Sequence, residues 1–390
     1  MRGLTRSESA QVPDHSVSWV ELLQDLVVVA TVLVLFEGLV KGLEDSWWIW
    51  YAAALVAVYL VWLAEVVVVN GFPRSNLMRQ IISMVWMTGM VIAATGVLWE
   101  NWSPGWALCV GVAIVLTATS AQYFFSSIPS RGNSDVPVAR MRSAAAMVLV
   151  GAVLAALAAV SPTGVSDVLL LISVVIGVLV PPLLLAGVLL DFHRLRESHL
   201  SERFGQLVLI MLGESFLEIV LGVREGGQFR PWLTVYTAIV VFTLWRAYFL
   251  LLLPAGPPRH HRRFIAWIGA HAVLVVGFGF AAASAGRWAT SSDAEFESLG
   301  WTNMGVAGIS VASAYVGIAA VAVAVNRRRV AGIYLLGAAG VTVITALLSR
   351  EGILGPWGTV PLVIVLIGVN LIATRWWSSP AQRTNVGPQS

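Results

Sequence analysis

Apolar residues recur along this chain in long stretches that are separated by short polar segments. A helix needs about 20 consecutive apolar residues to cross the hydrocarbon core of a bilayer. Twelve stretches reach or approach that length, and each is predicted to form a transmembrane helix. They cover residues 18–40, 47–69, 77–99, 104–126, 143–160, 168–190, 204–222, 232–253, 264–285, 301–325, 330–348 and 353–373. The predicted fold is therefore an all-α, polytopic membrane helix bundle.

The basic residues alternate between the two sides of these predicted spans. The N-terminal tail, the even-numbered loops and the C-terminal tail contain 18 of the 24 Lys and Arg residues. The odd-numbered loops contain 5, and the remaining residue, Arg246, lies inside a span. Because Lys and Arg are enriched in cytoplasmic loops, both termini are predicted to be cytoplasmic. The expected location is the inner or plasma membrane of the cell.

The composition supports the membrane prediction and excludes several other classes of protein. Hydrophobic residues make up 58% of the chain and charged residues 12%, whereas a soluble domain has about 25% charged residues. The single cysteine, Cys109, excludes a disulfide framework and a multi-cysteine metal site. A formal net charge of +3 is too small to indicate nucleic-acid binding. The partner that the composition indicates is the lipid bilayer.

Several ionisable side chains nevertheless lie inside the predicted spans, where a charge at the bilayer centre costs at least ~2.5 kcal/mol on insertion scales. They are Glu21, Asp25, Glu37, Glu65, Glu214, Glu218, Arg246 and His271. Glu37 lies near the outer end of its span and can reach the interface. The other seven are the predicted proton-binding or ligand-binding residues.

Glu21, Asp25, Glu65 and Arg246 are predicted at a similar depth in the cytoplasmic half of the membrane. We expect them to meet in a water-accessible cavity, and Glu21 and Asp25 to share one helix face because they are four residues apart. Two simpler explanations remain open. The first two acids would be stabilised by a helix N-terminus, and Arg246 would form a structural ion pair. For His271, ligand binding and simple packing are both open.

Glu214 and Glu218 lie one turn apart near the middle of the seventh predicted span. Two neighbouring acids in a low dielectric repel each other, so at least one is expected to be protonated near neutral pH. The five acids of the two groups, set against Arg246, carry a formal charge of −4. A low dielectric requires that this charge bind protons, a metal ion or a cationic ligand.

The segment VSWVELLQDLV at 17–27, and HLSERFG at 199–205 followed by LGES at 212–215, resemble the signature motifs of the bacterial low temperature requirement A (LtrA) family. The resemblance implies a polytopic bacterial membrane protein that is linked to growth in the cold. The chain departs from the family pattern at Gly71 and Gln122, where arginines are usual. The motif positions that carry over are Glu21, Asp25, His199, Glu202, Arg203, Gly213, Glu214 and Ser215.

His199 and Glu202 are three residues apart and would share a face of a helix. With a further carboxylate they would form a set of ligands for a divalent metal. The pattern favours a simpler explanation of the same residues, a solvated helix start capped by Ser198 or Ser201. The sequence therefore assigns no metal site and no cofactor.

The predicted organisation has four parts. A cytoplasmic tail (1–16) precedes a transmembrane region that contains the family motifs and the polar cluster (17–285). An apolar scaffold (286–373) and a second cytoplasmic tail (374–390) follow. The last three spans contain no ionisable residue and many small residues, which favour close helix contacts, so they form the expected surface for a homo-oligomer. A duplication of six spans also remains open, because spans 1 and 7 each carry two acids one turn apart.

The buried acids favour a proton-coupled transporter or carrier of an unidentified small solute. The first alternative is an intramembrane enzyme that acts on a lipid or other hydrophobic molecule. Against it, the sequence has no Gly-x-Ser-x-Gly elbow and no His-Glu-x-x-His motif. The second alternative is a non-catalytic membrane scaffold or accessory protein.

Overall fold

The computed structural model describes residues 18–42, 48–71, 77–99, 105–128, 138–181, 196–224, 229–290, 300–351 and 356–377. Throughout these segments the regular secondary structure is helical, without strands. The predicted all-α class is therefore confirmed. The predicted tail 1–16 lies outside the described residues. The predicted C-terminal tail begins inside the last helix, which continues to Trp377.

The first half of the chain forms six helices, of which the sixth ends in a π-helical turn. They are α1 (Trp19–Gly42), α2 (Trp48–Gly71), α3 (Leu77–Trp99), α4 (Trp106–Ser126), α5 (Val138–Ala159) and α6 (Thr163–Val174) with η1 (Val175–Leu179). The second half contains another π-helical segment after its second helix. Its elements are α8 (Glu197–Arg224), α9 (Pro231–Trp245), η2 (Arg246–Leu252), η3 (Leu253–Ala255), α10 (His261–Thr290), α12 (Gly300–Ala324), α13 (Arg328–Arg350) and α14 (Pro356–Trp377).

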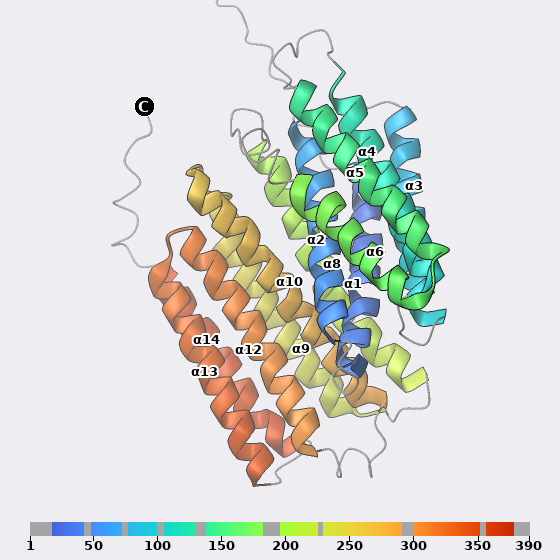
Figure 1. Ribbon diagram of the computed structural model, residues 1–390. Coiled ribbons are helices and arrows are strands. Elements are labelled where there is room, and N and C mark those ends of the chain that lie inside the picture. The colour runs from blue at the N-terminus through green and yellow to red at the C-terminus, as the bar shows by residue number, and fades with distance from the viewer. Residues whose placement is uncertain are drawn as a thin grey trace, which may run out of the picture.

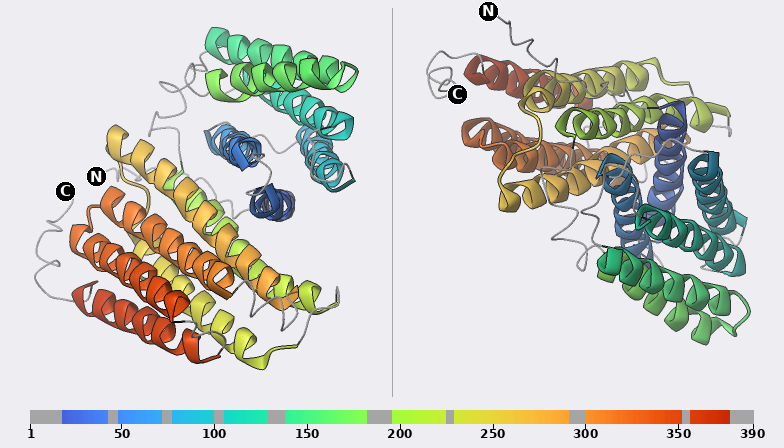
Figure 2. Two further views of the ribbon diagram at one scale, coloured as in Figure 1. Left: turned by 60° about the horizontal axis from the view of Figure 1, so that its bottom comes forward. Right: turned by 90° about the horizontal axis from the view of Figure 1, so that it is seen from above.

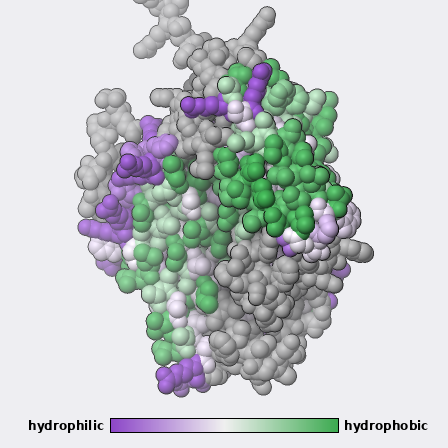
Figure 3. All heavy atoms as spheres, in the orientation of Figure 1, coloured by the Kyte–Doolittle hydropathy of each residue, from purple (hydrophilic) through white to green (hydrophobic). Residues whose placement is uncertain are grey.

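These helices account for the predicted spans. Within the described part of the chain, nine are long and apolar enough to cross a membrane. Three shorter apolar helices, Ala53–Val68, Thr163–Leu179 and Gly308–Ala324, overlap the second, sixth and tenth predicted spans. Hydrophobic residues fill broad areas along the sides of the helices, and hydrophilic residues gather near their ends (Figure 3). The polytopic helical bundle is confirmed, while the orientation in the membrane stays a prediction.

One boundary differs from the prediction in a way that matters for the site. Helix α8 begins at Glu197, although hydropathy predicts the start of this span at residue 204. Hydropathy marks only the apolar part of a helix, whereas its polar first turns are stabilised here by contacts with other helices. Arg203 therefore lies almost two turns inside a helix.

The helices form two groups with α1 and α2 between them (Figures 1 and 2). In one group α3, α4, α5 and α6 pack in sequence, and in the other α8, α10, α12, α13 and α14 do so, with α9 against α8 and α14. Helix α1 contacts α3 of the first group and α8 and α10 of the second. Any site on α1 is therefore placed between the two groups.

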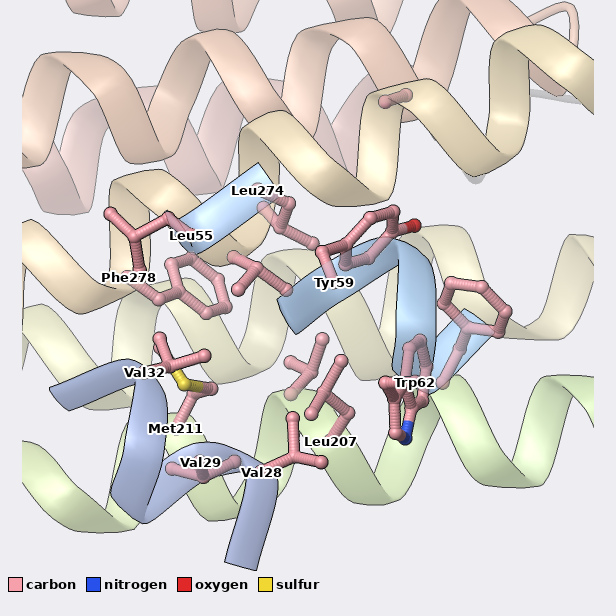
Figure 4. Close-up of a cluster of buried hydrophobic side chains, with 14 of the residues drawn as sticks. Val28, Val29, Val32, Leu55, Tyr59, Trp62, Leu207, Met211, Leu274 and Phe278 are labelled. Atoms are coloured by element: carbon pink, nitrogen blue, oxygen red, sulfur yellow. The ribbon is translucent and has the colours of Figure 1, made fainter. Parts of the chain in front are cut away.

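The core near this junction is apolar and aromatic. Figure 4 shows side chains from α1, α2, α8 and α10 in contact, with Val29, Trp62 and Phe278 among the buried residues. Trp62 and Phe204 meet edge to face, with ring centroids 5.1 Å apart, a geometry that aromatic pairs prefer. This core fixes α1 and α2 against α8.

Small residues allow the closest contacts in the second group. A Cβ atom on Gly277 of α10 would lie 2.5 Å from the Cα atom of Ala314 of α12, so only glycine fits there. On its other side α12 packs on α13, where Gly308 faces Thr345. Some of the small residues that suggested an oligomer surface are thus used inside the chain.

Candidate functional site

Glu21 is fixed at the N-terminus of α1 by a reciprocal cap. The Ser18 backbone N–H donates to Glu21 Oε2 at 2.8 Å, and the Glu21 backbone N–H donates to Ser18 Oγ at 3.3 Å. This is a capping box, which satisfies two helix-end donors at once. The same carboxylate lies 3.5 Å from His199 Nε2 and 3.8 Å from Arg203 Nη1. Arg79 of α3 approaches its other side, with Nη2 3.9 Å from Oε1.

Asp25 forms the centre of the site, one turn further into the bundle. Its Oδ1 atom accepts 2.7 Å hydrogen bonds from Arg203 Nη2 and from Trp62 Nε1. The side chains of Asp25 and Arg203 are both fully buried. Among the described residues, Asp25 Oδ2 and Arg203 Nε and Nη1 have no hydrogen-bond partner. The buried ion pair therefore retains open acceptors and donors.

Glu65 of α2 brings a third carboxylate to the same place. It is 1% exposed, and its Oε1 atom accepts a 3.3 Å hydrogen bond from Gln24 Nε2. Arg79 and Arg203 are near enough to act on its charge. Its Oε2 atom has no hydrogen-bond partner in the part of the chain that the structure describes. Glu65 thus has a weaker set of partners than Asp25.

The start of α8 is held in place by the end of α2. Asn70 Oδ1 accepts from the Arg196 backbone N–H at 2.6 Å, and Asn70 Nδ2 donates to the Arg196 carbonyl at 3.0 Å. These two bonds place the first turn of α8, from which His199 and Arg203 reach Glu21 and Asp25. The family motif residues thus act on the acids of α1.

We call this set of side chains the carboxylate–arginine cluster. It consists of Glu21, Asp25, Glu65, Arg79, His199 and Arg203. Three carboxylates face two guanidinium groups, so these five charged side chains carry a formal excess of one negative charge. The imbalance of −4 expected from the sequence is wrong for this cluster, because Arg79 and Arg203 belong to it and Glu214 and Glu218 do not.

The expected position of Arg246 is also wrong. Its guanidinium donates to Thr374 Oγ1 of α14 at 3.4 Å, and its charge acts on Tyr334 of α13. It therefore faces the second helix group. Any role of Arg246 in binding stays a prediction.

Glu214 and Glu218 lie further along α8. Glu214 is eleven residues from Arg203, which corresponds to about 16 Å along a helix. Its side chain is half-buried and forms no hydrogen bond or ion pair with another described residue. The Glu218 carboxylate lies over Gly286 of α10, where an added Cβ atom would be 2.6 Å from Glu218 Oε2. The pair is separate from the carboxylate–arginine cluster.

His271 is fully engaged within the core. Its Nδ1 atom is 2.8 Å from the Trp267 carbonyl oxygen, so Nδ1 carries the hydrogen and donates it. Nε2 then accepts from the Tyr248 hydroxyl at 3.0 Å. The rings of Phe204 and Trp267 pack against the imidazole. These contacts agree with the packing histidine that the sequence left open.

The remaining residues of the family motif differ in how far they are buried. His199 is buried beside Glu21, whereas Glu202 is exposed, so the two do not face a common ligand. Gly213 is exposed. Ser215 is buried and lines a small cavity of about 20 Å³ together with Tyr236 of α9 and Ser284 of α10.

Three members or partners of the cluster are not among the candidate residues that the sequence indicates. Arg79 lies in the first turn of α3, although its charge alone places it with the basic residues of the loops. Gln24 lies between two acids in an apolar span, and this spacing signals a shared polar face. Trp62 lies within the second predicted span, and a buried indole N–H needs an acceptor, which Asp25 provides.

Comparison with known proteins confirms the family resemblance. Residues 16–371 match the family described as Bacterial low temperature requirement A protein (LtrA). The matched region includes every helix from α1 to α13 and most of α14. No curated protein and no solved structure matches the chain.

Proposed function

The chain belongs to the bacterial low temperature requirement A (LtrA) family, and we propose that it is a proton-coupled carrier of a small solute. In this proposal it works in the bacterial cell membrane with the carboxylate–arginine cluster at the cytoplasmic side. The proton and the solute bind to that cluster.

The observation that carries the proposal is the excess negative charge of the buried cluster. Burying an uncompensated charge in a low dielectric is costly, and a binding proton or cation removes that cost. Ionisable residues within membrane spans are typically functional. Asp25 Oδ2 and Glu65 Oε2 are buried acceptors without a partner among the described residues. A proton or a cationic solute would satisfy them.

Within the cluster we assign the proton to Glu65. Asp25 receives two short hydrogen bonds, one from a guanidinium, and charge-assisted bonds of this kind hold a carboxylate ionised. Glu65 receives one longer bond from a neutral amide. A cationic solute that binds to the same negatively charged cluster would displace the proton. Because the solute and the proton compete for the cluster, the protein exchanges one for the other.

The position of the cluster supports coupling to a conformational change. Asp25 and Glu21 lie on α1, Arg79 on α3 of the first helix group, and Arg203 on α8 of the second. When a proton or a cation neutralises the cluster, the electrostatic attraction between the two helix groups changes. Transporters commonly place the site at such an interface and move one bundle against the other. The partly exposed side chains of Glu21 and Arg79 form the route of entry.

The test uses proteoliposomes with an acidic lumen and a pH-sensitive dye inside. Guanidinium, choline and arginine are added outside, because a solute whose ammonium or guanidinium group stays charged cannot cross the bilayer as a neutral base. A transported solute is expected to raise the lumenal pH with wild-type protein but not with Glu65→Gln. Glu197→Gln is the matched control, since Glu197 forms an exposed ion pair with Arg259.

Two results would contradict the proposal. One is a lumenal pH that responds to every solute in the same way with wild-type protein and with empty liposomes. The other is exchange by Glu65→Gln at the wild-type rate. A wild-type protein inactive with all solutes would favour the scaffold alternative.

A further inference from the structure

Helices α1 and α2 each present a face that changes from polar to apolar along its length. On α2, Glu65 shares a face with Val61 and Ala54, which are four and eleven residues away and so lie about one and three turns along the helix. On α1, Gln24 shares a face with Thr31, two turns further on. Gln24 and Glu65 are joined by a hydrogen bond, whereas Thr31, Ala54 and Val61 line an apolar cavity.

Helices α3 and α4 repeat this arrangement on the opposite side. Trp86 of α3 shares a face with Met90 and Ala93, and Gln122 of α4 shares a face with Val115. Met90, Ala93 and Val115 line the same apolar cavity. Trp86 and Gln122 are buried, and their Nε1 and Nε2 atoms have no hydrogen-bond partner among the described residues. On each of the four helices, a buried polar residue thus lies one or two turns from a residue that lines the cavity, and we call this set of facing positions the seam.

The apolar end is a cavity of about 110 Å³ formed by α1, α2, α3, α4, α6 and η1. Its lining is aliphatic apart from the side chains of Thr31 and Tyr51. Two of its lining residues, Ala53 and Leu171, are exposed on the side of the helix bundle. In another protein, an apolar cavity of ~150 Å³ stays free of water and binds benzene. The cavity is therefore suited to hydrocarbon, and part of its lining is exposed at the surface of the bundle.

We infer that the solute bound by the carboxylate–arginine cluster is a cationic amphiphile, with one positively charged head and one short hydrocarbon chain. This inference rests on the proposed carrier function and adds the substrate class. The head donates hydrogen bonds to Asp25 Oδ2 and Glu65 Oε2 and neutralises the excess negative charge. The chain follows the seam from Glu65 past Val61 into the cavity. The single charge of the head matches the single excess charge of the cluster.

The test measures how affinity depends on chain length. Alkylguanidinium ions with two, four, six and eight carbons are titrated calorimetrically into the full chain in lipid nanodiscs, and the signal of empty nanodiscs is subtracted. Wild-type affinity is expected to rise about fourfold for each buried methylene, from ~0.8 kcal/mol per CH₂. Ala57→Leu fills part of the cavity and should remove the gain for the longer chains while leaving ethylguanidinium binding unchanged. Ala30→Leu, on an exposed face of α1, should behave as wild type.

The outcomes separate this inference from the function on which it rests. Equal affinity for all chain lengths, with protons still released on binding, would overturn the amphiphile and leave the carrier intact. Equal binding of uncharged alkanols would overturn the cationic head. A failure of every guanidinium to bind or release a proton would contradict the inference together with the carrier's proposed cation–proton exchange.

A second measurement does not depend on the folding of Ala57→Leu. An alkylguanidinium with a photoreactive group at the chain end is crosslinked to the wild-type protein, and the labelled peptides are identified. Labels are expected in the cavity-lining parts of α2 and α6. Labels confined to α12, α13 or α14 would overturn the inference.

Discussion

Arg203 donates a 2.7 Å hydrogen bond to Asp25 across 178 residues of sequence, and both side chains are fully buried. The bond joins α1 to the second helix group. The remaining donors and acceptors of the pair have no hydrogen-bond partner among the described residues. The pair therefore holds two helices together and still has polar atoms that a ligand can bind. Stability and function are therefore expected to respond differently to changes at this pair.

Removing one partner of the pair should destabilise the protein more than removing both. Asp25→Leu or Arg203→Met alone leaves an uncompensated buried charge and is expected to cost about 3 kcal/mol. The double variant should recover most of this loss in stability, because hydrophobic side chains replace a buried ion pair at little cost. Thermal unfolding in detergent, performed as a double-mutant cycle, measures the difference. Additive losses would mean that the two side chains do not interact.

Trp62→Phe tests the neutral donor to Asp25. The substitution keeps an aromatic ring against Phe204 but removes the Nε1–H bond to the carboxylate. Hydrogen bonds to charged groups contribute about 1.5–3 kcal/mol, so a loss of stability near 2 kcal/mol is expected. Trp245→Phe serves as a control, since its described contacts are stacked rings. An equal loss in both variants would show that ring volume alone matters.

How much of this arrangement follows from the sequence can be seen at Glu65 and Arg246. The depth of a residue in the membrane follows from counting along an apolar stretch, and it correctly grouped Glu65 with Glu21 and Asp25. Depth does not give the direction in which a side chain points. Arg246 has a suitable depth but faces α14.

Arg203 shows a second limit of the sequence. Hydropathy predicts that the span begins at residue 204, just after Arg203, and so places Arg203 in a loop, although α8 already begins at Glu197. The polar first turns of this helix are stabilised by the contact of Asn70 with Arg196. A tertiary contact between residues 126 positions apart leaves no mark on local hydropathy. The all-α fold, by contrast, follows from the apolar stretches alone.

Glu214→Gln tests the separate acid of α8. Glu214 is half-buried and has no polar partner among the described residues, so the variant should fold normally. Because it removes a titrating group from a low dielectric, we expect the pH dependence of transport to change. Glu218→Gln should have a smaller effect, since Glu218 lies against α10 and outside the family motif. A wild-type pH profile for Glu214→Gln would show that this acid is only structural.

The predicted orientation can be mapped with single cysteines. Cys109 is the one cysteine of the sequence and is buried, so Cys109→Ser gives a background without cysteine. Cysteines placed at Arg131 and Arg262 should both react only from the cytoplasmic side, because both positions belong to the basic set of loops. A cysteine at Arg224, an exposed position of the opposite set, is the control. Labelling of positions 131 and 262 from opposite sides would contradict the topology.

The central claim is that Glu65 carries a proton that a cationic solute displaces. An infrared difference spectrum, recorded on adding guanidinium to the purified protein, reports protonated carboxyl groups directly. The wild-type protein should lose one protonated carboxyl signal, and Glu65→Gln, which keeps the acceptor for Gln24, should lack this change. Guanidinium binding without any loss of a protonated carboxyl signal, or the same loss in Glu65→Gln, would contradict the account.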